Sequence, residues 1–172
     1  MKHGTTMLEI TSEMEVEASR QDAWELISDF EGVWEASNPS HRGTKVLSEP
    51  KQPIREGLQW WQRERLGPLL GEFTATVREV IPGHCFRWVA NAEYFICKLT
   101  IPIREGGTFT IEPTDAGCLL RHNLWGEFPK GVHGRLLEWS ARHLLNCERA
   151  MEQHNLVELD YFRQRLEGKN SW

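Results

Sequence analysis

No stretch of the sequence approaches the roughly 18 consecutive apolar residues that a membrane-spanning helix needs. The first residues also lack the basic, apolar and small-residue pattern of a signal peptide. No basic run offsets the net charge of -5, which argues against a general nucleic-acid binder. We therefore expect a cytoplasmic protein with no nucleic-acid partner and no membrane insertion.

The sequence also lacks the motifs of several enzyme classes. It contains no G-x-G-x-x-G or G-x-x-x-x-G-K-[ST] phosphate loop, no G-x-S-x-G elbow and no H-E-x-x-H pair. His143 and Cys147 have the i, i+4 spacing of metal ligands on a helix, but no third or fourth ligand accompanies them. We expect neither a metal nor another cofactor.

Cysteine is scarce, and the cysteines are widely spaced in the sequence. The four residues, Cys85, Cys97, Cys118 and Cys147, form no C-x-x-C pair, which favours free and mostly buried thiols. Repeats, low-complexity tracts and linkers are absent, and 172 residues suit one domain. We place this single domain at 8–168, with flexible ends at 1–7 and 169–172.

Tryptophan, by contrast, is abundant, with eight residues in the chain. Its side chain is large and amphipathic, so this density suits a wide hydrophobic interior or a pocket with stacking walls.

The stretch 134–167 has the strongest helical pattern. At 100° per residue an apolar stripe runs along it, and Gly168 follows where a C-terminal cap favours glycine. We predict one continuous amphipathic helix covering a large apolar surface. The stripe consists of Leu137, Ala141, Leu144, Met151, Leu159, Phe162 and Leu166.

The rest of the chain predicts one strand, two short helices and then a series of strands. Ser19 begins the first helix as an N-cap, with Asp22 three residues later, and the helix runs to about Phe30; 33–40 favours a second. Turn-favouring residues, Gly106-Gly107 among them, separate the strands, and short connections favour an antiparallel meander. The predicted strands are 8–16, 43–49, 57–66, 71–80, 84–90, 107–113 and 117–127.

The segment 91–105 is harder to interpret, because it contains an apolar run from Tyr94 to Ile101 followed by Pro102. A continuation of the preceding strand, a lid over a pocket and an exposed contact surface all remain open.

Four stretches resemble one family. They are 23–31 with Asn38-Pro39, the strand–turn–strand 77–88, the last strand 117–128, and 155–167. In their order and spacing they resemble the START/Bet v 1-like (SRPBCC) superfamily, particularly its polyketide cyclase/dehydrase and lipid-transport branch. Ser37 departs from the aromatic residue that the family often has before Asn-Pro.

This resemblance implies an α+β helix-grip fold. In that fold a curved seven-stranded antiparallel sheet, with two short helices, grips a long C-terminal helix around a hydrophobic cavity. Members bind lipids, sterols, polyketides or plant hormones, and some are aromatases or cyclases, so the fold does not fix the function.

Two polar residues, Glu148 and Asn155, lie in the apolar stripe of the long helix. Facing a cavity they would orient a polar group of a ligand, and burial would raise the pKa of Glu148 and suit it to acid–base work. Alternatively, Glu148 pairs with an arginine of the sheet and Asn155 bonds a strand backbone.

His122 alternates with Leu120 and Leu124 on what we predict to be the inward face of the last strand. Such a histidine either polarises a ketone or shuttles a proton, or is a neutral core residue. His122 and Glu148 are the candidate catalytic residues.

Aromatic strand residues complete the candidate ligand-binding set. Adjacent Trp60 and Trp61 must point to opposite faces, and we place Trp60 inward. These side chains either stack on a flat ligand or simply fill the core. The candidate ligand-binding residues are Trp60, Phe73, Phe86, Trp88, His122, Leu124, Leu144, Glu148, Met151 and Asn155.

Three functions follow as hypotheses. The first is binding of a small hydrophobic ligand between sheet and helix; the second is an aromatase/cyclase-type enzyme acting in the same cavity; the third is a protein-interaction module using 91–105. A second strip of Trp139, His143, Val157 and Tyr161 suits either a homodimer contact or packing under the N-terminal strand.

Overall fold

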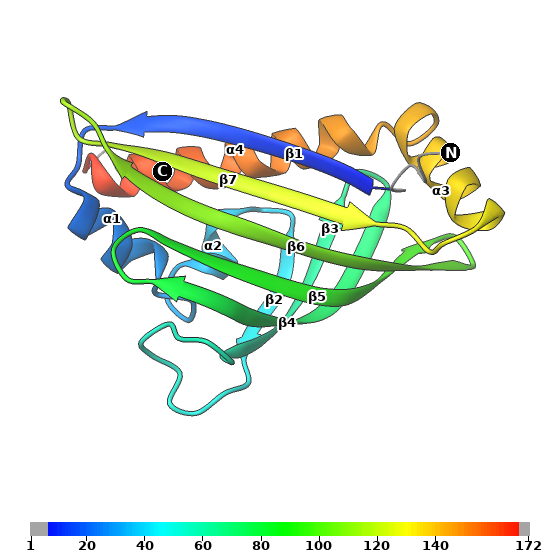
Figure 1. Ribbon diagram of the computed structural model, residues 1–172, viewed down its shortest axis with the longest axis horizontal. Coiled ribbons are helices and arrows are strands. Elements are labelled where there is room, and N and C mark those ends of the chain that lie inside the picture. Colours follow the sequence, from blue (N-terminus) through cyan, green and yellow to red (C-terminus); the bar gives the residue numbers. More distant parts are fainter. Residues whose placement is uncertain (1–6, 169–172) are drawn as a thin grey trace.

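A computed structural model describes residues 7–168, and all seven of its strands belong to one curved antiparallel sheet (Figure 1). Each strand pairs with its neighbours in sequence, except that β1 closes the order against β7: β1-β7-β6-β5-β4-β3-β2. The strands are β1 (Met7–Val16), β2 (His41–Val46), β3 (Gln59–Leu66), β4 (Leu69–Ile81), β5 (Cys85–Ile96), β6 (Leu99–Pro113) and β7 (Cys118–Glu127). The predicted α+β class and seven-stranded antiparallel sheet are confirmed.

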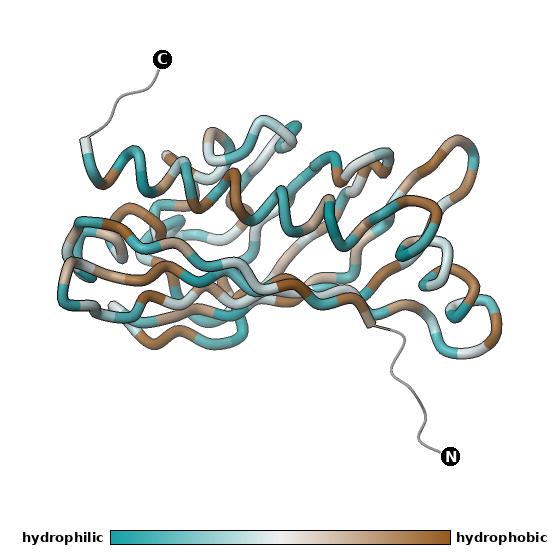
Figure 2. The backbone as a smooth tube through the Cα atoms, turned by 90° about the horizontal axis from the view of Figure 1, so that it is seen from above, coloured by the Kyte–Doolittle hydropathy of each residue, from teal (hydrophilic) through white to brown (hydrophobic). Residues whose placement is uncertain are grey.

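Helices cover the concave face of this sheet. The short helices α1 (Arg20–Ile27) and α2 (Trp34–Ser37) follow β1, and α3 (Val132–His143) and α4 (Cys147–Leu166) follow β7. The predicted cap is present, since the Ser19 side chain accepts a hydrogen bond from the Asp22 backbone N–H. Seen from above, α4 runs along the length of the strands (Figure 2), and it packs against β1 and β7.

The prediction of one uninterrupted helix over 134–167 is wrong. The helical stretch ends at His143, and Asn146 adopts a left-handed conformation (φ 51°, ψ 43°) before α4 begins at Cys147. Asparagine tolerates this conformation better than most residues with a side chain, so the chain can turn here between two helices. The apolar stripe is therefore not one face: Leu144 is exposed, and Leu145 turns inward.

The segment 91–105 continues the sheet. β5 extends to Ile96 and β6 begins at Leu99, so this apolar run forms a long hairpin rather than a lid. Its alternate residues Tyr94, Ile101 and Ile103 are buried, whereas Leu99 at the hairpin turn is 67% exposed, so burial accounts for part of its apolar character.

Gly106 and Gly107 are not the predicted turn. They lie within β6, opposite Val89 and Trp88 of β5. A Cβ atom at Gly107 would come within 2.8 Å of the Trp88 indole nitrogen, and one at Gly106 within 2.6 Å of the Trp125 ring. Glycine is required here because two tryptophans pack directly against the strand backbone.

An aromatic core fills the end of the sheet near α1 and α2. Trp34 lies at its centre, with ring centroids 4.9 Å from Phe30, 5.5 Å from Phe162 and 6.1 Å from Phe109. The Trp34 indole also donates a hydrogen bond to the Ile27 carbonyl oxygen at 2.7 Å. These ring contacts pack the aromatic residues closely together in this part of the interior.

The ends of the described chain bear on the predicted domain boundaries. Met7, which we assigned to a flexible end, is the first residue of β1, whereas 1–6 and 169–172 lie outside the described residues.

The four cysteines are free; Cys118 and Cys147 are buried, and Cys97 is exposed. None of the helices in the described part of the chain is long and apolar enough to cross a membrane.

Candidate functional site

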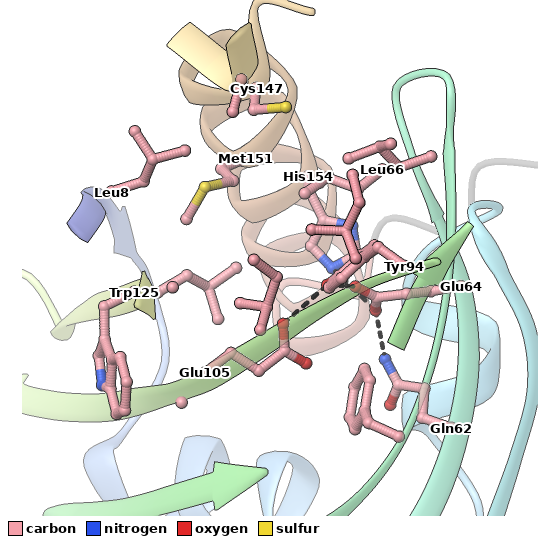
Figure 3. Close-up of a pocket in the computed structure, with 18 of the residues that line it drawn as sticks. Leu8, Gln62, Glu64, Leu66, Tyr94, Glu105, Trp125, Cys147, Met151 and His154 are labelled. Atoms are coloured by element: carbon pink, nitrogen blue, oxygen red, sulfur yellow. Dashed lines mark hydrogen bonds and ion pairs between the residues drawn. The ribbon is translucent and has the colours of Figure 1, made fainter. Parts of the chain in front are cut away.

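A cavity lies between the sheet, α3 and the first half of α4 (Figure 3). It offers about 110 Å³ to the centres of water-sized molecules, whereas one water needs only about 10–15 Å³ on this scale. Apolar residues dominate its lining, including Leu8, Leu66, Leu69, Leu137, Leu145 and Phe128. Such a hollow suits a small organic molecule better than isolated waters.

Three of the predicted aromatic residues form one wall of the cavity. Phe73 and Trp88 stack with an interplanar angle of 6° and ring centroids 5.8 Å apart, and Trp60 meets Trp88 edge-on at 5.6 Å. Trp60 points inward and Trp61 does not, as predicted from strand alternation. Flat, rigid surfaces of this kind suit stacking against a ring.

Other predicted residues divide into those that line the cavity and those that lie behind its wall. His122, Leu124 and Met151 line it. Phe86 is fully buried in the aromatic core instead, with its ring centroid 5.5 Å from Phe30. Asn155 is also fully buried, and its amide donates to the His122 carbonyl oxygen at 3.0 Å, which matches the structural alternative stated above.

Glu148 and Leu144 lie outside the cavity. The break before α4 turns both toward the surface: Leu144 is 67% exposed and the Glu148 side chain is 41% exposed. Glu148 pairs with Arg142 of α3 rather than with an arginine of the sheet. The expected desolvated Glu148 facing a cavity is therefore wrong, and His122 and Glu148 are not brought together.

The polar end of the cavity contains carboxyl groups that sequence reasoning did not select. The Tyr94 hydroxyl donates to Glu105 at 2.8 Å and lies 3.4 Å from Glu64 (Figure 3). Gln62 donates to the second Glu64 oxygen at 2.6 Å. All four side chains are buried; Gln62 and Glu64 come from β3, Tyr94 comes from β5 and Glu105 from β6, and β4 lies between β3 and β5 in the sheet.

Burial strongly perturbs two of these groups. Burial, together with the nearby Glu64 charge, raises the pKa of Glu105 to about 8. The same burial, followed by the charges of Glu105 and Glu64, raises the pKa of Tyr94 well above its ordinary value. Near neutral pH Glu105 is therefore mainly a neutral acid, able to donate a hydrogen bond or a proton.

A second buried cluster surrounds Glu158 on α4. Its Oε1 lies 2.9 Å from Nε2 of His154 and 3.1 Å from Nε2 of His41, and its Oε2 lies 3.0 Å from Nδ1 of His122. Glu158 is 1% exposed. Helix α4 is thus joined to β2 and β7 through one carboxylate.

Glu158 and the neighbouring His154 and His41 stabilise one another's charged forms. Burial alone would raise the pKa of Glu158, but His154 and the contacts to His122 and His41 hold it well below its usual range. Burial alone would lower the pKa of His154, but the Glu158 and Glu64 carboxylates raise it to about 9. The pKa of His41 is also raised, because the Glu158 contact outweighs its burial.

One signal could have revealed part of this cluster. His154 and Glu158 are four residues apart, the spacing that places two side chains on one helical face. His41, Glu64, Tyr94 and Glu105 come from separate strands, and their convergence depends on sheet register, which the sequence alone does not specify closely enough.

A curved sheet closed by a terminal helix over a mainly apolar cavity defines a helix-grip protein. The family model for "polyketide cyclase / dehydrase and lipid transport" matches residues 7–155, so the chain belongs to this family. A search of curated protein sequences finds no match to this chain.

Solved structures with low sequence identity share the fold. A START superfamily protein from Mycobacterium smegmatis has 18% identity and a TM-score of 0.63, with 94% of this chain and 97% of that chain covered. Norcoclaurine synthase from Thalictrum flavum, in complex with a transition-state analogue, has 13% identity and a TM-score of 0.66, with 99% and 100% covered.

A third similar structure is a di-domain ARO/CYC protein of the steffimycin biosynthetic pathway, with 10% identity and a TM-score of 0.63. The match covers 95% of this chain but 52% of that one, so this chain spans about half of the two-domain protein. At these identities the similarities establish the fold alone.

Proposed function

We propose that this protein binds a small, largely apolar compound, containing a ring or an acyl chain, in the cavity between the sheet and α4. The supporting observation is a mainly apolar cavity with a stacked aromatic wall and a buried polar cluster that includes Tyr94 and Glu105. The apolar part of the ligand would lie against Trp60, Phe73, Trp88, Leu124 and Met151, and a hydroxyl or carbonyl group would face Glu105 and His122. Membership of a family described by lipid transport and cyclase activity agrees with this proposal.

Native mass spectrometry of freshly purified protein, before and after denaturing extraction, tests it. We expect a bound compound in the wild type that Met151→Trp excludes, because the larger side chain fills the cavity. The matched control is Leu156→Trp, at an exposed position of the same helix, which should retain the compound. Equal occupancy in both variants, or no uptake of any supplied lipid or aromatic compound, would contradict the proposal.

The second candidate function is a cyclase or dehydrase acting on a ketone in the same cavity. The observation that favours it is Glu105, a cavity-lining acid that is mainly protonated near neutral pH. Proton transfer from a positioned acid contributes about 10²–10⁴-fold to a rate. Glu105→Gln should reduce turnover of a supplied poly-β-ketone by this factor without weakening its retention. A wild type that retains the ketone unchanged would leave binding as the function.

The homodimer stays a prediction. Trp139 of the proposed second strip is 51% exposed on α3, whereas Tyr161 of the same strip packs against the core from α4. Sedimentation of the wild type and of Trp139→Glu tests whether this surface joins two copies.

A further inference from the structure

Three buried side chains direct potential ligand atoms toward one point beside the cavity. They are His41 from β2 and His154 and Glu158 from α4, and their ligand atoms all lie within 4.8 Å of one another. Nε2 of His154 and Nε2 of His41 lie 2.9 and 3.1 Å from the same oxygen, Oε1 of Glu158. The cluster combines two imidazoles with one carboxylate.

The outer nitrogen of each ring is held by a separate contact. Nδ1 of His41 lies 2.8 Å from the Trp34 carbonyl oxygen, and because a carbonyl only accepts, Nδ1 carries the proton. Nδ1 of His154 lies 3.1 Å from the Ser40 hydroxyl. Contacts of this kind, on the nitrogen remote from the ion, fix the ring orientation of metal-binding histidines.

The inner nitrogen of His41 lacks a hydrogen bond. Although Glu158 Oε1 is 3.1 Å away, the two groups do not meet in hydrogen-bond geometry, and Nε2 has no hydrogen-bond partner among the described residues. The His41 side chain is completely buried. Because the Glu158 contact raises the pKa of His41, a cation bound here must displace the proton from Nε2. The ring that remains, with its proton on Nδ1, then presents a lone pair at Nε2 to the ion.

We propose that His41, His154 and Glu158 bind a divalent transition-metal cation such as Zn²⁺ through Nε2, Nε2 and Oε1. Two histidines and one glutamate are an established ligand set for zinc sites that keep an open position. Ligands of a tetrahedral zinc ion at about 2.0–2.1 Å lie about 3.3–3.4 Å from one another. The 2.9 and 3.1 Å separations are close to this value, and the two imidazole nitrogens lie within 4.8 Å of each other, so metal binding would draw the three side chains around a common centre.

The fourth position of this site faces Glu64 and the cavity. Oε2 of Glu64 lies 3.9 Å from Nε2 of His41 and 4.0 Å from Nε2 of His154. In their ionised forms, Glu64 and Glu158 together balance the charge of a divalent cation. Glu64, His154 and Glu158 all line the cavity, so the polar group of a cavity ligand could approach the metal directly.

Zn²⁺ titration of chelator-treated protein by calorimetry tests the proposal without any organic ligand. We expect one Zn²⁺ per chain, at least about 100-fold weaker binding in Glu158→Gln, and about 10–100-fold weaker binding in Ser40→Ala through the loss of ring orientation. His143→Ala, at an exposed histidine of α3, is the control and should bind as the wild type does.

Spectroscopy of wild-type protein keeps the test decisive if a variant does not fold. X-ray absorption should show two imidazole nitrogens and carboxylate oxygen at about 2.0–2.1 Å from bound zinc. Absence of stoichiometric zinc binding, a sulfur ligand, or equal affinity in folded Glu158→Gln would overturn the site. These results are independent of whether an apolar compound occupies the cavity.

Discussion

At the scale of single residues, the unusual feature is an acid kept protonated in an apolar cavity. Glu105 is 8% exposed, and its Oε2 accepts a hydrogen bond from the Tyr94 hydroxyl while Oε1 has no hydrogen-bond partner among the described residues. Because burial penalises the carboxylate and the Glu64 charge adds to that penalty, the pKa of Glu105 is about 8 in place of the ordinary 4.5.

This shift predicts a pH dependence of stability. Between pH 4.5 and about 8 the folded protein holds the Glu105 proton more tightly than the unfolded chain does, so stability falls as the pH rises through this window. Glu105→Gln mimics the protonated acid and should remove this loss, on the order of 5 kcal/mol across the window. Urea unfolding at a series of pH values measures it.

The control for this prediction is Glu93→Gln, at an exposed carboxylate on β5. Its unfolding free energy should follow the wild-type pH profile. Parallel profiles for Glu105→Gln and the wild type would show that Glu105 titrates normally.

Gly107 provides a second test at this scale. Gly107→Ala would place a Cβ atom 2.8 Å from the Trp88 indole nitrogen, which disturbs the stacking of Trp88 on Phe73. We expect a loss of about 1–3 kcal/mol in unfolding free energy, as overpacked positions show. Gly126→Ala on β7, whose nearest contact would be at 3.4 Å, should lose less, and near-ultraviolet circular dichroism should report the Trp88 disturbance only in the first variant.

At the scale of elements, the decisive feature is the separation of α3 from α4 at Asn146. The left-handed conformation there breaks a pattern that would otherwise continue for more than eight helical turns at about 3.6 residues each. The side chain of Asn146 makes no capping hydrogen bond, so its backbone conformation is its structural contribution.

The effects of alanine and glycine at Asn146 on stability test whether the chain breaks between α3 and α4 at this residue. Asn146→Ala should destabilise the protein by about 1 kcal/mol, because alanine carries a steric cost in the left-handed region. Asn146→Gly should be neutral or slightly stabilising. If the helix were continuous, the order would reverse, since alanine favours a helix interior over asparagine and glycine. Chemical denaturation of both variants distinguishes the two arrangements.

Local sequence patterns predicted where the helices and strands lie better than they predicted where those elements are interrupted. Period-two alternation identified β1, β3, β4 and β7, and Ser19 was recognised as a cap from its spacing to Asp22. The break at Asn146 carries no proline or glycine, and Gly106-Gly107 has turn composition inside a strand. At Gly106-Gly107, the packing of Trp88 and Trp125 against the strand overrides the local preference.

The candidate site was predictable only in part, for the same reason. Strand alternation placed Trp60, Trp88 and His122 on the inner face, where they lie. Glu148 depended on the helix phase, which the Asn146 break changes. The clusters around Glu105 and Glu158 required knowledge of which strands become neighbours.

At the scale of the whole molecule, a solid aromatic core and a hollow share one interior. The aromatic core around Trp34 lies near α1 and α2, and the cavity extends from Phe30 and Trp34, which line it, to α3 and the start of α4. The hollow should make the protein sensitive to pressure, because unfolding eliminates internal void volume. A protein without an internal void would lack this contribution to the volume change of unfolding.

Met151→Trp should therefore make the volume change of unfolding less negative by a few tens of mL/mol. Pressure unfolding followed by tryptophan fluorescence, with Leu156→Trp as the surface control, measures the difference. An unchanged unfolding volume in Met151→Trp would mean that the hollow is already filled or collapsed in solution.

The separation of the two C-terminal helices also affects how a guest would enter and leave. Buried ionic and amide contacts fasten α4 to the strands through Glu158 and Asn155, whereas α3 leaves Val132 and Leu136 open to solvent. If a ligand enters beside α3, we expect its passage to displace this 12-residue helix and to leave the 20-residue α4 in place.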